Sequence, residues 1–163
     1  PEYRVQHLGD DDTDGPVIGW YPLEEKPNAK ILVLRYLTEG GVAPSTGKFL
    51  TYREIPWGEV YFKQFQGRCL FRLAFGFGGK LDKFREIMER VGAQAISSGD
   101  VGYELEFMKG LFVRLILWAG DDEFPPSAQI LFSDNFPAAF TQGEDMAVVG
   151  DVTIDMLKAL AAK

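Results

Sequence analysis

YELEFMKGLFVRLILWAGDDEFPPSAQILF, residues 103–132, contains three apolar runs separated by short polar turns. The runs are Tyr103–Met108, Leu111–Trp118 and Ala128–Phe132, and each is rich in the aromatic and branched side chains that favour strands. Because strands that follow one another across short turns usually pair antiparallel, this segment predicts a three-stranded antiparallel meander.

Helical patterns precede the predicted meander. Residues 27–39 are apolar nearly all round and stop at Gly40-Gly41, which predicts a buried helix. Two amphipathic helices follow, with apolar residues at spacings of three and four. These residues are Phe62, Phe65, Cys69, Leu73 and Phe77 in the first helix, and Leu81, Phe84, Ile87, Met88 and Val91 in the second, which stops at Gly92. A further strand is predicted at Phe49–Ile55, because Pro56 and Gly58 interrupt the pattern after it.

The two ends of the chain complete the predicted fold. Thr141 and Glu144 have the spacing of a capping box, which predicts the start of a closing helix. Tyr3–Leu8 and Val17–Tyr21 alternate like strands and predict a hairpin across Asp14-Gly15. Together these elements predict a single α+β domain over residues 1–163, with an antiparallel sheet and helices packed mainly on one face. The chain opens on Pro1 without a methionine, so we expect that it has been processed or lacks an N-terminal segment.

Composition excludes several classes of protein. The chain of 163 residues has a net charge of −7, which disfavours a nucleic-acid partner because that affinity comes largely from Lys and Arg on phosphates. No apolar run approaches the roughly 18 residues that span a bilayer, so we expect no membrane partner. With one cysteine, Cys69, and one histidine, His7, the chain offers no disulfide, zinc site, iron–sulfur cluster or histidine triad. We predict a soluble cytoplasmic protein without a cofactor.

An acidic stretch, GDDDTDG at residues 9–15, raises the question of calcium. Asp10, Asp12 and Asp14 have the spacing of a calcium loop, and Gly15 follows as that loop requires. The twelfth position of such a loop should be glutamate, but here it is Tyr21, and the flanks alternate like strands. We therefore predict an acidic hairpin turn and no metal site, with these three aspartates as weak candidates.

Two features of the first amphipathic helix invite a cofactor interpretation. Residues 75–79, FGFGG, are glycine-rich, but a dinucleotide fingerprint needs a strand before the glycines and here they separate two helices. We interpret them as a turn. An aromatic stripe with neighbouring bases could stack on bases or a flat cofactor, but its helical spacing favours core packing. Its residues are Tyr61, Phe62, Phe65, Phe71 and Phe75, with Lys63, Arg68 and Arg72.

The loop between the last two strands of the meander carries the main site candidates. Three adjacent carboxylates, Asp121, Asp122 and Glu123, must stay solvated there or share a cation. The two prolines after Phe124 hold the chain extended, so Phe124 is predicted to be a rigid apolar anchor. The loop is either a charged tip that protects strand edges or a surface for a ligand or partner. Glu144 and Asp145 are candidates for paired acid–base chemistry at this tip, although a helix start also explains them.

Residues 111–150 resemble a bacterial and archaeal family known only as a domain of unknown function, family 3786. The resemblance rests on W-x-G-D-D-E-F-P-P-S at Trp118–Ser127, on Glu144-Asp145 and on Gly150, with weaker likeness through Thr51–Pro56 and the helix at residues 27–39. It is poorer between Phe136 and Gly143. The resemblance implies a fold without an established activity, and it implies that some members carry a cysteine-rich iron–sulfur segment that this chain lacks.

Two functions of different classes remain open. The first is a non-catalytic binding or accessory module that uses the tip and nearby aromatics to bind a protein or small-molecule partner. The candidate residues are Trp118, Asp121, Asp122, Glu123, Phe124, Ser127, Glu144 and Asp145. The alternative is a metal-assisted enzyme that relies on carboxylates alone, because oxygen ligands suit magnesium or calcium. Convergence of four or more carboxylate oxygens from separate segments would favour the enzyme.

Overall fold

Three long strands form the centre of the sheet, as the apolar runs predict. The structure is a computed structural model and describes residues 26–163. The strands β3 (Val101–Met108), β4 (Leu111–Trp118) and β5 (Ser127–Ser133) pair antiparallel in sequence order. Their register places the buried residues Tyr103, Leu115 and Ile130 side by side. These residues contribute to the core from one face of the sheet. The predicted meander is confirmed.

Two short strands complete the sheet at its edges. β1 (Phe49–Thr51) pairs with β5, and β2 (Gln94–Ile96) pairs with β3, so the strand order is β1-β5-β4-β3-β2. The prediction of a strand over Phe49–Ile55 is therefore too long, because the chain turns into a 3₁₀ helix at Tyr52–Glu54. β2 is missing from the prediction, since three residues, two of them exposed, are too few to establish an alternating pattern.

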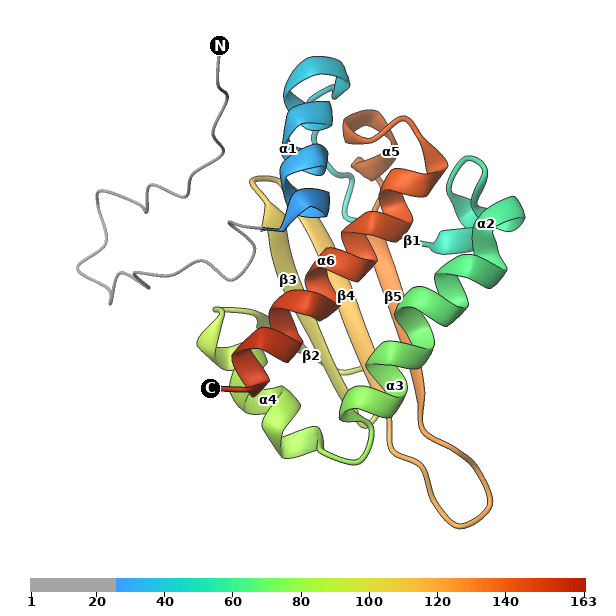
Figure 1. The fold of residues 1–163 in the computed structure, drawn as a ribbon, viewed down its shortest axis with the longest axis vertical. Helices are drawn as coiled ribbons and strands as arrows, with labels where there is room; N and C mark the ends of the chain where they lie inside the picture. Colours follow the sequence, from blue (N-terminus) through green and yellow to red (C-terminus); the bar gives the residue numbers. More distant parts are fainter. Residues whose placement is uncertain (1–25) are drawn as a thin grey trace, which may run out of the picture.

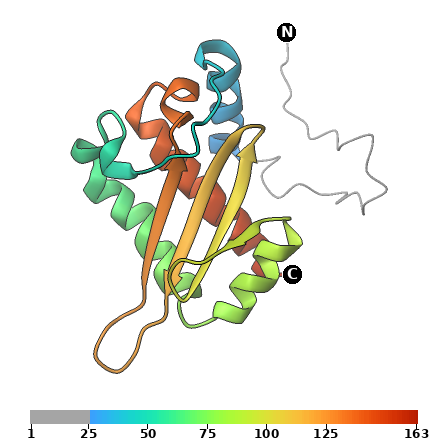
Figure 2. The same cartoon turned by 180° about the vertical axis from the view of Figure 1, so that it is seen from behind.

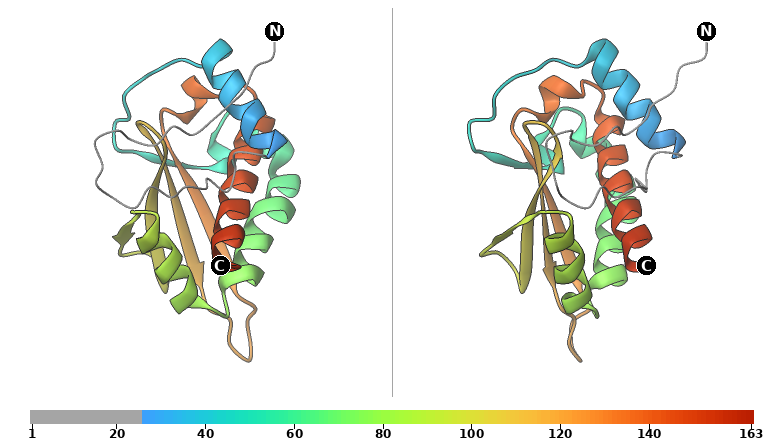
Figure 3. Two further views of the ribbon diagram at one scale, coloured as in Figure 1. Left: turned by 60° about the vertical axis from the view of Figure 1, so that its left-hand side comes forward. Right: turned by 90° about the vertical axis from the view of Figure 1, so that its left-hand side faces the viewer.

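Helices cover one face of the sheet, as predicted, and none of the helices among residues 26–163 lies on the other face (Figures 1, 2 and 3). α2 (Gly58–Phe65) and α3 (Phe71–Phe77) form one rod, joined by a π-helical turn at Gln66–Leu70, and α6 (Gly143–Ala161) lies beside it. α4 (Leu81–Arg90) packs against β3 and α6. The predicted apolar faces are confirmed, because the residues that define them are buried or partly buried. The fully buried ones are Phe65, Cys69, Leu73, Phe77, Phe84, Ile87 and Met88.

α1 (Pro27–Glu39) has the predicted bounds, but the prediction that it is buried is wrong. Only Leu32 is buried, whereas Ile31, Leu34 and Leu37 are exposed. α1 packs against α6 at the end of the helical layer, so it has a neighbour on one side. Apolar residues all round a helix cannot reveal this, because topology sets the number of neighbours.

The start of α6 also differs from the prediction. The helix begins at Gly143 with Gln142 at the N-cap, and Thr141 makes no cap, so the predicted capping box is wrong. The short helix α5 (Phe136–Ala139) precedes it. Close packing fixes this end instead, because a β-carbon at Gly143 would lie 2.9 Å from the Trp57 Cβ. The Tyr52 hydroxyl donates a hydrogen bond of 3.0 Å to the carbonyl oxygen of Gly143.

Aromatic rings fill the core between the sheet and the helices. Tyr52 stacks on Phe65 with ring centroids 4.0 Å apart, and Phe132 lies edge-on to Phe136 at 5.4 Å.

None of the helices among residues 26–163 is long and apolar enough to cross a membrane. The predicted hairpin at Tyr3–Leu8 and Val17–Tyr21, with His7 and the acidic loop, lies outside the described residues.

Candidate functional site

The connection between β4 and β5, residues 119–126, projects beyond the sheet and is called the tip below (Figure 1). Its bend is held by Asp121, whose carboxylate accepts hydrogen bonds from the backbone N–H groups of Glu123 at 2.9 Å and Phe124 at 2.7 Å. The Asp121 N–H in turn donates to the Phe124 carbonyl at 2.8 Å. The bond from the Phe124 N–H, followed by that from Glu123, lowers the pKa of Asp121, so its charged form stabilises the bend.

Pro126 fixes the tip against the end of α3. A β-carbon at Gly78 would lie 2.4 Å from the Pro126 Cβ, and one at Gly120 would lie 2.7 Å from the Pro126 Cδ. Only glycine leaves room for the proline ring on both sides. The tip therefore packs directly against the end of α3 at Pro126.

The other predicted residues of the tip face solvent. Phe124 is 68% exposed, so the predicted anchor has a fixed backbone and an exposed ring. Asp122, Glu123 and Ser127 are also exposed. Trp118 is 39% exposed and lies beside the turn that contains Gly99. The tip thus presents one large apolar side chain among carboxylates.

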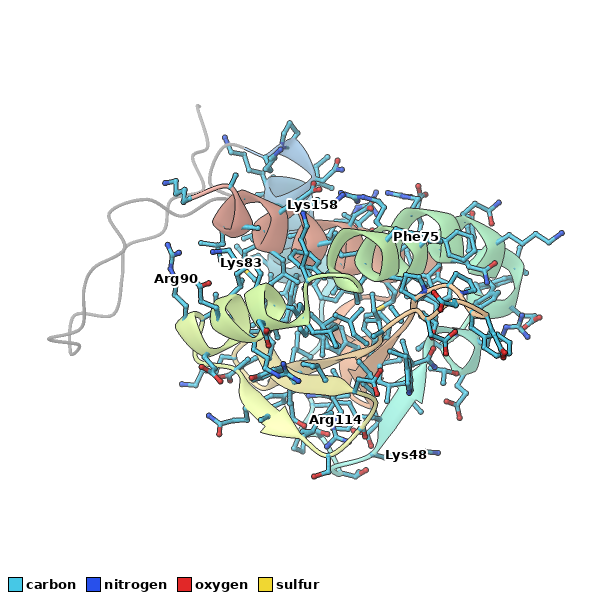
Figure 4. The ribbon with its side chains drawn as sticks, turned by 90° about the horizontal axis from the view of Figure 1, so that it is seen from below. Lys48, Phe75, Lys83, Arg90, Arg114 and Lys158 are labelled. Carbon is cyan, nitrogen blue, oxygen red and sulfur yellow. The ribbon has the colours of Figure 1, made fainter. Side chains whose placement is uncertain are left out.

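Two further aromatic rings on α3 lead to the tip. Phe71 is 49% exposed and Phe75 is 65% exposed, with ring centroids 6.2 Å apart. Gly78 follows Phe71 by two helical turns, so Phe71 and Gly78 lie on the same side of α3. Because Gly78 contacts Pro126, this side of α3 adjoins the tip. On the side of α3 that faces α6, Lys158 lies beside Gly76, away from Phe75 (Figure 4). Phe71, Phe75 and Phe124 are called the aromatic surface below.

The prediction that the whole aromatic stripe packs in the core is thus wrong for part of it. Phe65 is buried and Phe62 is partly buried, but Tyr61, Phe71 and Phe75 are exposed. The positions of Phe71 and Phe75 fall between the members of the buried series that includes Leu73 and Phe77. That offset is the sequence signal that could have identified them.

The two arginines beside these aromatics are neutralised by carboxylates of the same fold. The Arg68 Nε lies 2.8 Å from an Asp151 carboxylate oxygen, and Arg72 reaches Asp151 at 2.7 Å and Asp155 at 2.5 Å. These ion pairs join the π-helical turn and α3 to α6. Sequence reasoning missed them, although two aspartates four residues apart on one helix face provide the signal.

Glu144 and Asp145 do not lie at the tip. They begin α6, at the opposite end of the sheet (Figure 1). Asp145 is buried and paired with the guanidinium group of Arg35, whereas Glu144 is exposed. Burial raises the pKa of Asp145, and the charge of Arg35 opposes that effect. The structure therefore separates this pair from the tip carboxylates.

Cys69 is not a reactive group in this arrangement. It is fully buried, and its thiol lies 3.4 Å from the Ala147 carbonyl oxygen. Burial, followed by the nearby charge of Asp151, raises the pKa of Cys69 to about 12. The thiol therefore stays protonated at neutral pH and serves packing.

Carboxylates do not converge in the part of the chain that the structure describes. Among residues 26–163, no three side chains of His, Cys, Asp or Glu gather so that they could hold a metal ion. Asp10, Asp12 and Asp14 lie outside this range. The described residues therefore assemble a surface of exposed aromatics with acidic neighbours.

Comparison with known proteins gives a family match. No curated protein and no solved structure matches the chain significantly. The family described as "Domain of unknown function (DUF3786)" matches residues 1–156. That match spans nearly the whole of the 163 residues, including the tip, α3 and most of α6. The chain therefore belongs to the DUF3786 family.

Proposed function

We propose that this domain is a non-catalytic module that binds a protein partner through the aromatic surface and the tip. The observation that carries the proposal is the exposure of Phe71, Phe75 and Phe124 on backbone that is held in place. Large aromatic side chains contribute most of the binding energy at many protein interfaces. Because Pro126 is already packed on Gly78, little ordering of this backbone would be needed on binding.

A protein partner fits this surface better than a small molecule. Small-molecule sites are usually concave and enclose most of the ligand. Here the tip projects from the domain, and its largest side chain points into solvent. We propose that the residues flanking Phe124 in the chain form the rim of the interface. These residues are Trp118, Asp121, Asp122, Glu123 and Ser127.

The alternative of a carboxylate-based enzyme gains no support from the arrangement of the acids. Asp121 is used to hold the tip, Asp145 is paired with Arg35, and Asp151 is paired with two arginines. Each therefore has a structural partner. We also propose a cytoplasmic bacterial protein without a nucleic-acid partner, supported by the net charge of −7 and the single cysteine.

Site-specific photocrosslinking in a bacterial host that contains a family member tests this function. A photoreactive phenylalanine analogue would replace Phe124, and as a matched control it would replace Leu37, which is 72% exposed on α1. We expect a discrete crosslinked protein from position 124, and we expect that Phe75→Asp in the same chain abolishes it. Position 37 should give none. Equal crosslinking from both positions, or no effect of Phe75→Asp, would refute a binding site at the aromatic surface.

A further inference from the structure

The free edge of β5 points to the form of the partner. We propose that Ser127–Ile130 accepts an extended segment of a partner protein, which pairs with β5 as an additional strand. This inference rests on the proposed function and deepens it, because the strand would bind next to Phe124 and along the side of the domain that carries the aromatic surface.

Within the described part of the chain, this edge is left uncovered because β1 is short. β1 pairs with Leu131–Ser133 and then ends at Thr51. There the Glu54 carboxylate accepts hydrogen bonds from the Thr51 N–H at 2.7 Å and from its hydroxyl at 3.0 Å, and the chain turns away. Among residues 26–163, the β4 ladder supplies the backbone partners of residues 127–130, and no other strand adjoins them. Figure 2 shows β1 crossing only the upper end of β5.

The other long edge of the sheet is protected, and this one is not. β2 covers β3 up to Glu104, and the part of β3 beyond it, residues 105–108, contains Glu106 and a register shift between Glu106 and Met108. Charges and such irregularities are devices that keep strand edges from pairing. The free part of β5 has the uncharged sequence Ser-Ala-Gln-Ile and pairs with β4 without a shift. The contrast within one sheet indicates that the β5 edge is kept available.

The chemistry of the edge selects an extended polypeptide. Every second residue of an edge strand turns its N–H and C=O groups outward, and another backbone in extended form satisfies both. The edge starts directly after Pro126, so an added strand would run beside the exposed ring of Phe124. On the helical side it would meet α3, which packs against β5 and carries Phe71 and Phe75.

Charge complementarity adds a preference for basic residues. Asp121, Asp122 and Glu123 carry negative charges at the tip, and no ion pair to a described residue neutralises them. Such a surface attracts lysine and arginine and repels an acidic segment. The expected partner segment therefore alternates apolar and basic residues.

A peptide titration followed by NMR tests the inference. The probe is the blocked heptapeptide acetyl-Lys-Val-Lys-Val-Lys-Val-Lys-amide, added to the full chain with isotope labelling. We expect saturable shifts in the amides of residues 127–130. The matched control is the same peptide with its valines and lysines N-methylated, which keeps the charge and apolar side chains but removes the strand donors from both edges of the peptide. We expect it to bind about tenfold more weakly.

Other results would overturn the inference in distinguishable ways. Shifts at the rings of Phe75 and Phe124 without shifts at residues 127–130, or equal binding of the N-methylated peptide, would leave the aromatic surface as a binding site and reject strand addition. Uniform protection of the amides of residues 127–130 from hydrogen exchange in the peptide-free protein would mean that the edge is already filled, by this chain's own residues or a second copy. No saturable shift up to the solubility of the peptide would also reject it.

Discussion

Gly150 of α6 lies directly against Cys69 of the π-helical turn, and a β-carbon at position 150 would come within 2.7 Å of the Cys69 Sγ. The ring of Phe65 closes the same gap at 3.3 Å. The two helical segments are therefore in direct contact at Gly150, which has no side chain, and Cys69, which has a small one. The adjacent ion pairs of Arg68 with Asp151 can form because the segments approach so closely.

We predict that Gly150→Ala destabilises the protein. Overpacking a tight core contact typically costs about 1 to 3 kcal/mol, and the better helix propensity of alanine offsets about 1 kcal/mol of it. Urea denaturation followed by circular dichroism measures the change. In a Cys69→Ala background the same substitution should cost less, because the sulfur atom is gone. Equal costs in both backgrounds would show that the contact is not the cause.

The cap at Thr51 should matter and the one predicted at Thr141 should not. Glu54→Ala removes the acceptor of both hydrogen bonds from Thr51, so its thermal unfolding temperature should fall. Thr141→Ala, the matched control at an exposed residue, should leave that temperature unchanged. A fall in the control alone would restore the predicted capping box.

The effect of Glu54 should also depend on pH. The bond from the Thr51 N–H, followed by that from the hydroxyl, lowers the pKa of Glu54 below its ordinary value of 4.5. A lowered pKa means that the charged group stabilises the fold fully above pH 4.5. The difference in unfolding temperature between the wild type and Glu54→Ala should therefore shrink as the pH falls through the lowered value.

Asp145 should show the opposite pH dependence. Burial raises its pKa above the ordinary value of 3.8, so the folded chain holds the proton more tightly than the unfolded chain. Its contribution to stability is then fully present below pH 3.8 and is lost as the pH rises through the raised value. Asp145→Asn should remove this loss, so the variant should gain in stability relative to the wild type as the pH rises. The stability of both proteins would be compared by urea denaturation at about pH 3.5, below the ordinary pKa of the carboxyl group, and at about pH 7, well above it.

Arg35 provides the control for that experiment. Arg35→Gln leaves the Asp145 carboxylate buried without its cation, so this variant should be destabilised most at neutral pH. A Asp145→Asn variant that is as unstable as Arg35→Gln at pH 7 would mean that the ion pair outweighs the burial of the carboxylate.

The ring of Phe124 should contribute little to stability. Because the side chain is 68% exposed, Phe124→Ala should change the free energy of unfolding by no more than about 0.5 kcal/mol. Gly78→Ala should be clearly destabilising, since its β-carbon would collide with Pro126 at 2.4 Å. Urea denaturation distinguishes the two. A loss of several kcal/mol in Phe124→Ala would mean that the ring is buried in solution.

Elements with a long and regular apolar pattern can be predicted from the sequence. The meander of β3, β4 and β5 and the buried faces around Leu73 and Ile87 follow from their apolar runs and periodic spacing. The bounds of α1 follow from its apolar composition and from the stop at Gly40-Gly41. Local spacing also fixed Phe124 on a stiff segment, because proline restricts the residue before it. The resemblance at Trp118–Ser127, Glu144-Asp145 and Gly150 led to the family that matches residues 1–156.

Tertiary structure alone decided which of these residues are exposed and which meet. A periodic pattern specifies a face but not the neighbour that covers it, so α1 was predicted to be buried although only Leu32 is. Phe71 and Phe75 are free because no element packs over that side of α3 among the described residues. The tip and Asp145 are separated because α6 starts at the other end of the sheet, and Asp145 instead pairs with Arg35, 110 residues away in the chain. Such long-range contacts depend on how the layers pack, which local propensity does not encode.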